Sequence, residues 1–268
     1  MSRAGRDGNE SGGPGRPRGE SDGRDGSILA TGPGPPRPER IPVLASLLFA
    51  VLAAGQLALA GRCVLRYRVT GDRLLLVPAV VCAALAYDNG VLAAGRWIGA
   101  GATLESWSTP RFIAHIVLTP LLMPWACAAA ARAGVGWART RWTRTTIAAV
   151  TAVVIVLGVA AELTPLTLAP REWAGTMRYT TAHASVAGLL SPVVTVVVVL
   201  VAAVAVWRAR GYRLWTVTTV IMTVVAAAMP PMLLTNGAEL VFTAGVVVTA
   251  VWLAEPFRVP GAAAGAAH

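Results

Sequence analysis

Lysine is absent from the sequence, so all 23 basic residues are arginine. A retinal pigment binds its chromophore through a lysine amine, and a phosphate-binding loop of the Walker A type needs a lysine that reaches the phosphates. The absence of lysine therefore excludes both kinds of site.

Charged residues are also scarce. They make up 13% of the 268 residues, whereas hydrophobic residues make up 55% and the mean hydropathy is +0.61. A soluble domain carries about 25% charged residues. Long apolar runs recur between Ile41 and Ala254, and this repetition is typical of a membrane protein that crosses the bilayer several times.

The three cysteines, Cys63, Cys82 and Cys127, show no CxxC or Cys/His spacing. The sequence thus indicates neither a disulfide framework nor a zinc site, and we expect the cysteines to be small buried apolar residues. Aspartate-rich, HExxH and GxSxG motifs are missing too. We therefore expect no metal ion and no cofactor.

Large aliphatic residues are almost missing from residues 1–40, where Ile28 and Leu29 stand among Gly, Pro, seven arginines and six acidic residues. This composition predicts a disordered tail. Its charges nearly cancel and it has no aromatic residue, so no nucleic-acid partner is expected. We divide the chain into this tail, a membrane domain over 41–256 and a short disordered tail over 257–268.

Seven apolar runs fill the membrane domain, each close to the roughly 20 residues that a membrane-spanning helix needs. We predict an all-α fold with seven transmembrane helices in one bundle, the last two joined by a tight turn at 235–237. The predicted spans are 41–61, 74–95, 110–131, 145–163, 182–207, 214–234 and 238–254.

Arginines are concentrated on alternate connections between these spans. The positive-inside rule then predicts a multi-pass protein of the cell membrane, with the N-terminus outside and the C-terminus in the cytoplasm. The arginines of the three rich connections are Arg62, Arg66, Arg68 and Arg73, then Arg132, Arg139, Arg141 and Arg144, then Arg208, Arg210 and Arg213.

Polar side chains inside the spans gather in the predicted outer half. Asp88 and Asn89 lie about 10 Å below the outer end of the second span. The other polar residues of the predicted outer half are Arg111, His115, Glu162, His183, Asn236 and Glu239. Gln56 is the exception, because it lies in the cytoplasmic half of the first span. Ionisable groups are costly in a bilayer and mark functional sites, so we predict a polar-floored cavity that opens outward.

Asp88 is the deepest of these acids. Apolar surroundings can keep a carboxylic acid protonated, and such an acid can protonate an alkene or an epoxide. Arg111 could instead form a structural ion pair with Asp88 or with Glu105. Outer tryptophans such as Trp107 could serve as interfacial anchors.

The segment Ala86-Tyr87-Asp88 and the late acid Glu239 resemble two patches of the small integral-membrane terpene cyclases of fungal meroterpenoid pathways and their actinobacterial indole-sesquiterpene relatives. Those proteins have seven spans, an acid in an Ala-Trp-Glu context at the second span and another near the last. This chain differs in having Tyr87 for Trp and Asp88 for Glu.

The resemblance implies an enzyme that cyclises a lipophilic isoprenoid without a cofactor. Asp88 would donate the first proton to a terminal epoxide or alkene, and Glu239 would be its partner. The residues expected to bind the substrate are Tyr87, Asn89, Arg111, His115 and Asn236.

Two other classes of function stay open. A proton-coupled transporter or permease subunit would use Asp88 and His115 as a relay, although no internal repeat is evident. A non-catalytic scaffold or sensor would use Asp88 only to pair with Arg111. The oligomeric state is not indicated by the sequence.

Overall fold

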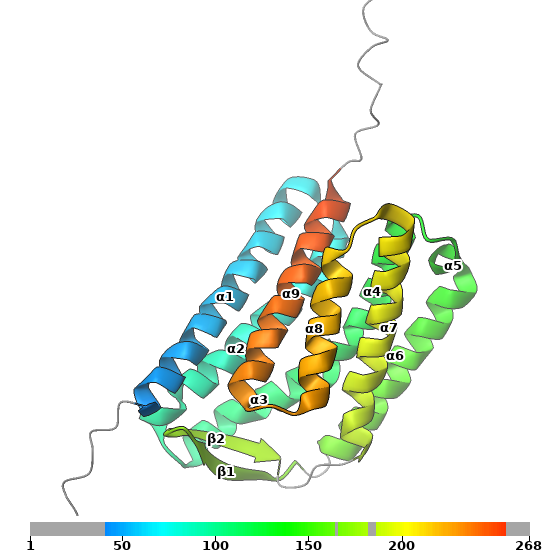
Figure 1. Ribbon diagram of the computed structural model, residues 1–268. Coiled ribbons are helices and arrows are strands. Elements are labelled where there is room, and N and C mark those ends of the chain that lie inside the picture. The colour runs from blue at the N-terminus through cyan, green and yellow to red at the C-terminus, as the bar shows by residue number, and fades with distance from the viewer. Residues whose placement is uncertain (1–40, 164–165, 182–185, 256–268) are drawn as a thin grey trace, which may run out of the picture. The chain divides into compact units, whose positions relative to one another are not determined.

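The computed structural model describes residues 41–163, 166–181 and 186–255, and most of them are helical (Figure 1). The two predicted tails and His183 lie outside these ranges. The helices are α1 (Ile41–Thr70), α2 (Leu76–Ile98), α3 (Ala102–Leu118), α4 (Leu122–Arg132), α5 (Gly136–Arg139), α6 (Arg141–Glu162), α7 (Val186–Arg210), α8 (Leu214–Ala228) and α9 (Met232–Ala254). Two 3-10 helices, η1 (Arg73–Leu75) and η2 (Thr119–Leu121), precede α2 and α4.

Among the described residues, six helical stretches are long and apolar enough to cross a membrane: α1, α2, the continuous α3–η2–α4, α6, α7 and α9. The prediction of an apolar helical protein is therefore confirmed. Helix α8 has only 15 residues, fewer than the roughly 20 of a full span. A seventh span stays a prediction.

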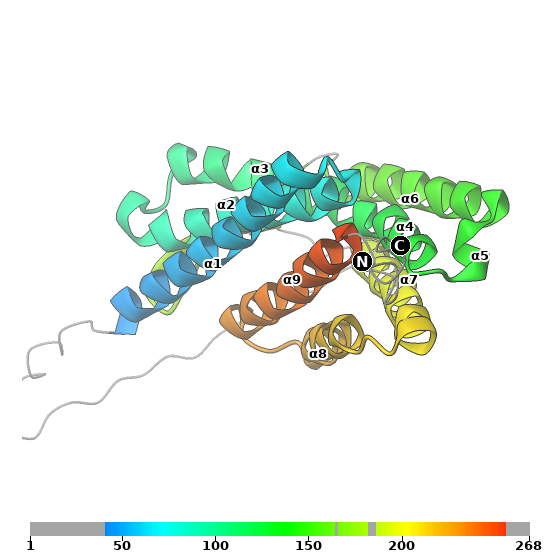
Figure 2. The same ribbon diagram turned by 90° about the horizontal axis from the view of Figure 1, so that it is seen from above.

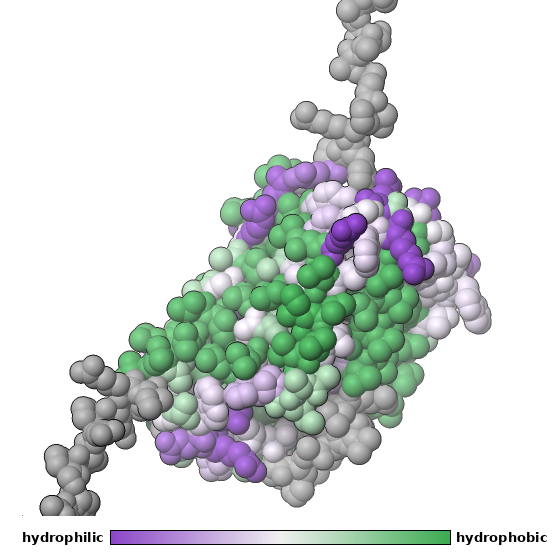
Figure 3. Space-filling view, in the orientation of Figure 1, coloured by the Kyte–Doolittle hydropathy of each residue, from purple (hydrophilic) through white to green (hydrophobic). Residues whose placement is uncertain are grey.

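Apolar residues dominate the middle of the molecular surface. In Figure 3 a hydrophobic band covers the exposed faces of the helices, and hydrophilic residues gather at the two ends. Many large aliphatic side chains are exposed, for example Val51, Leu57 and Val156. A surface of this kind suits contact with lipid, and it supports a membrane protein.

The helices pack as two groups. Helices α1, α2 and α9 contact one another, and α4, α6 and α7 form the second group. Helix α3 joins the groups through α2 and α6, while α8 joins them through α7 and α9. Figure 2 shows α8 between α7 and α9. Cys63, Cys82 and Cys127 are free and buried in this packing, which confirms that part of the sequence prediction.

The boundary between α8 and α9 differs from the prediction. The chain turns at Met229–Pro231, and α9 begins at Met232, so the turn predicted at 235–237 is wrong. Pro230 and Pro231 explain the difference, because proline cannot continue the helix and restricts the residue before it. Met229 takes a left-handed backbone with φ 44°. Asn236 and Glu239 consequently lie inside α9.

Two of the predicted spans are shorter than the helices that contain them. Helix α1 continues to Thr70, so Arg62, Arg66 and Arg68 lie on its last turns and not in a loop. Helix α3 begins at Ala102, so Arg111 lies well inside it. Polar residues at a helix end reduce the hydropathy without ending the helix, and for this reason the apolar runs are shorter than the helices.

A β-hairpin replaces part of the connection that the all-α prediction treated as a loop. Strands β1 (Leu168–Trp173) and β2 (Thr176–Thr181) are antiparallel and joined by Ala174 and Gly175. Both turn residues have positive φ, as a tight hairpin turn of the primed type requires. The prediction missed the hairpin because no long alternating apolar pattern marks the strands.

The hairpin packs against the N-terminal part of α1 and the C-terminal end of α2. The ring of Trp173 meets that of Phe49 edge-on at 6.0 Å between centroids, and Ser46 hydrogen-bonds Thr176 at 3.1 Å. The backbone carbonyl of Met177 lies so close to Gly95 that a Cβ at this position would be 1.9 Å from the oxygen. The hairpin therefore covers one end of the first helix group.

Candidate functional site

An apolar cavity lies between the two helix groups. Its volume is about 150 Å³, and it takes its walls from α2, α3, η2, α4, α7, α8 and α9. Most of the lining is aliphatic or aromatic, and the polar members are His115, Thr119, Thr195, Glu239 and Thr243. A mostly apolar cavity with a few polar groups is the usual form of a small-molecule site.

His115 and Glu239 face each other on the cavity wall. Nε2 of His115 lies 3.8 Å from Oε1 of Glu239, and the two side chains are 45% and 18% exposed. On its other side, Nδ1 of His115 lies 3.3 Å from the carbonyl oxygen of Arg111. This contact favours a proton on Nδ1 and leaves Nε2 directed toward Glu239. The pair can therefore hold a proton at the cavity.

Two threonines add hydroxyl groups to the lining of the same cavity. The Thr195 hydroxyl is buried without a hydrogen-bond partner in the described parts of the chain. Thr243 donates to Oε1 of the buried Gln56 at 3.0 Å. A buried hydroxyl without a partner costs free energy, so a bound polar atom in the cavity would find a partner at Thr195.

Asp88 and Arg111 form a separate, buried ion pair. Nε of Arg111 lies 2.6 Å from Oδ1 of Asp88, and neither residue lines the cavity. The structure thus shows the ion-pair arrangement that the sequence left open. Arg111 lies one turn before His115 on α3, so the Asp88 pair fixes the part of α3 that carries His115.

The remaining predicted site residues lie around this pair and outside the cavity lining. Nδ2 of Asn236 donates to Oδ1 of Asn89 at 3.0 Å, and this buried contact joins α9 to α2. Tyr87 is 41% exposed, and its hydroxyl donates to the carbonyl oxygen of Trp107 at 2.8 Å. The structure therefore brings the predicted residues together as neighbours and places only His115 and Glu239 at the cavity.

Sequence reasoning overlooked Thr195, Thr243 and the aliphatic wall. Thr195 stands alone in a run of valines on α7, and a single hydroxyl in such a run gives little signal. Thr243 lies one turn after Glu239 on α9. That spacing of four could have linked Thr243 to the predicted site, because residues four apart share a helix face.

Comparisons of the chain with models of known protein families, with curated proteins and with solved structures find no match. The function must therefore be argued from the site itself.

Proposed function

We propose that the chain is an integral-membrane terpene cyclase in which His115 and Glu239 handle the protons and Asp88 holds the site in shape. One observation carries the proposal: His115 and Glu239, the titratable side chains among the described residues that line the apolar cavity, face each other at 3.8 Å. General acid–base catalysis needs such a pair within reach of the substrate. Asp88 lies outside the cavity and is neutralised by Arg111.

The cavity volume limits how the substrate binds. About 150 Å³ is less than the roughly 300–1,000 Å³ of a typical small-molecule site. The cavity is partly open, and its apolar walls match an isoprenoid. We therefore expect the reactive end of the chain to enter, while the rest extends toward the lipid.

The chemistry favours a terminal epoxide over a plain alkene, because an imidazolium or a carboxylic acid is a weak acid and an epoxide oxygen is far more basic than a carbon–carbon double bond. Protonation forms an O–H bond and breaks a C–O bond. The double bonds of the chain then close the rings, and the last cation returns a proton to the pair. The net reaction is an isomerisation, so it consumes no oxidant, reductant or cofactor.

The transporter alternative receives less support from the described interior. Between the cavity and the arginine-rich end the buried side chains are mostly apolar, among them Cys63, Val246 and Ala250, and the described polar ones there are mainly threonine hydroxyls such as that of Thr249. A proton relay across the membrane would need polar groups along this route. The expected relay member Asp88 is also held by Arg111.

The test is production of the protein in a host that supplies prenylated compounds with and without a terminal epoxide, followed by mass spectrometry of the products. Glu239→Gln and His115→Gln should each reduce turnover by about 10²–10⁴, as expected when a general acid–base group is lost. Glu105→Gln is the matched control, since Glu105 is an exposed carboxylate on α3 outside the cavity.

The outcomes separate the site from the function. Cyclised product from the wild type that persists at full rate in both cavity variants would place the chemistry elsewhere. No cyclised product from the well-expressed wild type, with either class of compound, would refute the cyclase proposal.

A further inference from the structure

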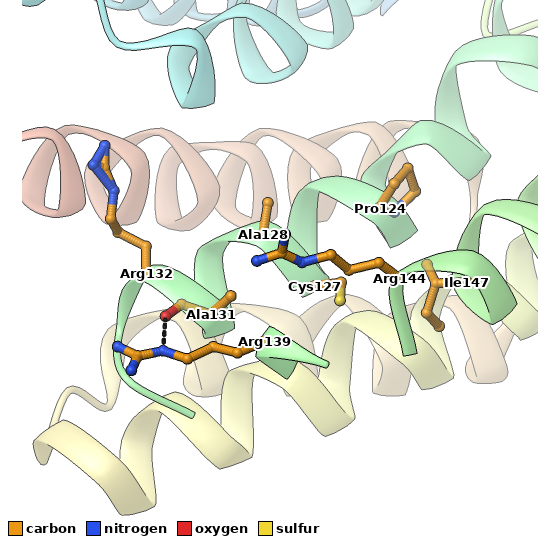
Figure 4. Close-up of a pocket in the computed structure, with 8 residues that line it drawn as sticks. All are labelled: Pro124, Cys127, Ala128, Ala131, Arg132, Arg139, Arg144 and Ile147. Carbon is orange, nitrogen blue, oxygen red and sulfur yellow. Dashed lines mark hydrogen bonds between the residues drawn. The ribbon is translucent and has the colours of Figure 1, made fainter. Parts of the chain in front are cut away.

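A second, larger pocket lies at the arginine-rich end of the helices, away from the proposed active site. It has a volume of about 670 Å³ and is formed by α4, α5 and α6. Figure 4 shows Arg144 extending from α6 toward Ala128 on α4, and Arg139 lying beside Ala131. The pocket thus combines guanidinium groups with a wall of small apolar residues.

The arginines of this pocket differ in the hydrogen bonds and ion pairs that their guanidinium groups make. Arg132 forms an ion pair with Asp72. Nε of Arg139 donates to the carbonyl oxygen of Ala131 at 3.2 Å, which leaves its terminal nitrogens for another acceptor. For the guanidinium group of Arg144 the described residues provide neither a hydrogen bond nor an ion pair, and none of the described residues that line the pocket is acidic. Two positive charges therefore lack a counter-ion within the described part of the protein.

An apolar crevice continues from the pocket into the helices. The crevice has a volume of about 140 Å³ and shares Cys127 and Ile147 with the pocket. Its other walls are Trp137 and the α7 residues Val197, Val198, Val201 and Ala202. A ligand that fills both spaces must be anionic at one end and apolar at the other.

We propose that this pocket binds an anionic phospholipid, with its phosphate at Arg139 and Arg144 and an acyl chain in the crevice. Guanidinium groups bind phosphate through paired, charge-assisted hydrogen bonds. Basic pockets between membrane helices suit acidic lipid headgroups. A water-soluble phosphate compound would satisfy the arginines and leave the crevice unused, so the apolar walls favour the lipid.

The experiment uses the full-length protein, purified in a neutral detergent and titrated with phosphatidylglycerol or with phosphatidylcholine of the same acyl chains. Native mass spectrometry counts the lipids that each protein molecule retains. We expect one phosphatidylglycerol to be retained by the wild type in preference to phosphatidylcholine. Arg144→Gln should weaken this retention by at least about tenfold, as the loss of one charge-assisted contact predicts.

Arg141→Gln is the matched control, because Arg141 is an exposed arginine at the same end of α6 that does not line the pocket. It should retain phosphatidylglycerol like the wild type. An equal loss in both variants would show a general effect of charge and refute the site. Equal retention of phosphatidylcholine and phosphatidylglycerol would also refute it. Displacement of the lipid by inorganic phosphate at the same concentration would indicate a site for a soluble anion and would refute the lipid site. Arg139→Gln tests the second phosphate contact, while Arg144→Gln carries little risk of misfolding because its side chain is exposed.

Discussion

At the scale of single residues, the buried pair of Asp88 and Arg111 sets the largest expected effect on stability. Both residues are less than a tenth exposed, and Nη1 of Arg111 has no hydrogen-bond partner in the described chain. Asp88→Asn would leave the guanidinium buried without a counter-charge. We expect the free energy of unfolding to fall by about 3–5 kcal/mol, measured by thermal or denaturant unfolding in detergent.

Asp72→Asn provides the control for this prediction. Asp72 also pairs with an arginine, but Arg132 is 44% exposed, so the loss should be only about 0–1 kcal/mol. Asparagine can still cap η1 as Asp72 does. If the Asp88→Asn protein is as stable as the wild type but inactive, Asp88 is the proton donor and the structural role that we assign to it is wrong.

At the scale of elements, the hairpin of β1 and β2 depends on a close approach to α2 at Gly95. A Cβ there would be 1.9 Å from the carbonyl oxygen of Met177, so Gly95→Ala must displace the hairpin. We expect a loss of about 1–3 kcal/mol of stability, as for other overpacked sites. Faster proteolysis of residues 168–181 should accompany it.

Gly90→Ala is the comparison on the same helix. No atom lies within 4 Å of a Cβ at Gly90 apart from its own helix backbone and chain neighbours, and alanine is the better helix former by about 0.5–1 kcal/mol. This variant should be neutral or slightly more stable, with an unchanged rate of proteolysis. Equal stability of the two variants would show that the hairpin does not rest on Gly95 in solution.

At the scale of the whole molecule, the arginines define a polarity that topology mapping can test. The arginine-rich connections all lie at one end of the helices, and the hairpin lies at the other (Figure 1). Reporter fusions at Gly136 and Gly211 should therefore read cytoplasmic, and a fusion at Gly101 should read external. A cytoplasmic signal at Gly101 would reverse the predicted orientation and place the His115–Glu239 cavity in the inner half of the bilayer.

The sequence by itself indicated the class of this protein and two of the polar residues that line its cavity. Low charge and repeated apolar runs indicate a bundle of membrane helices, because a helix satisfies its own backbone hydrogen bonds in lipid. The few polar residues inside those runs, including His115 and Glu239, stand out because they are costly there. Spacing along one helix also indicated that Arg111 and His115 share a face.

Only the tertiary structure decided which polar groups meet. In a membrane helix the side chains facing lipid and those facing the core are both apolar, so the sequence pattern does not give the rotation of each helix. That rotation pairs Asp88 with Arg111 and places Glu239 beside His115 on the cavity wall. The hairpin was equally hidden, because its strands are short and its packing depends on contacts with Phe49 and Gly95, which are distant in the sequence.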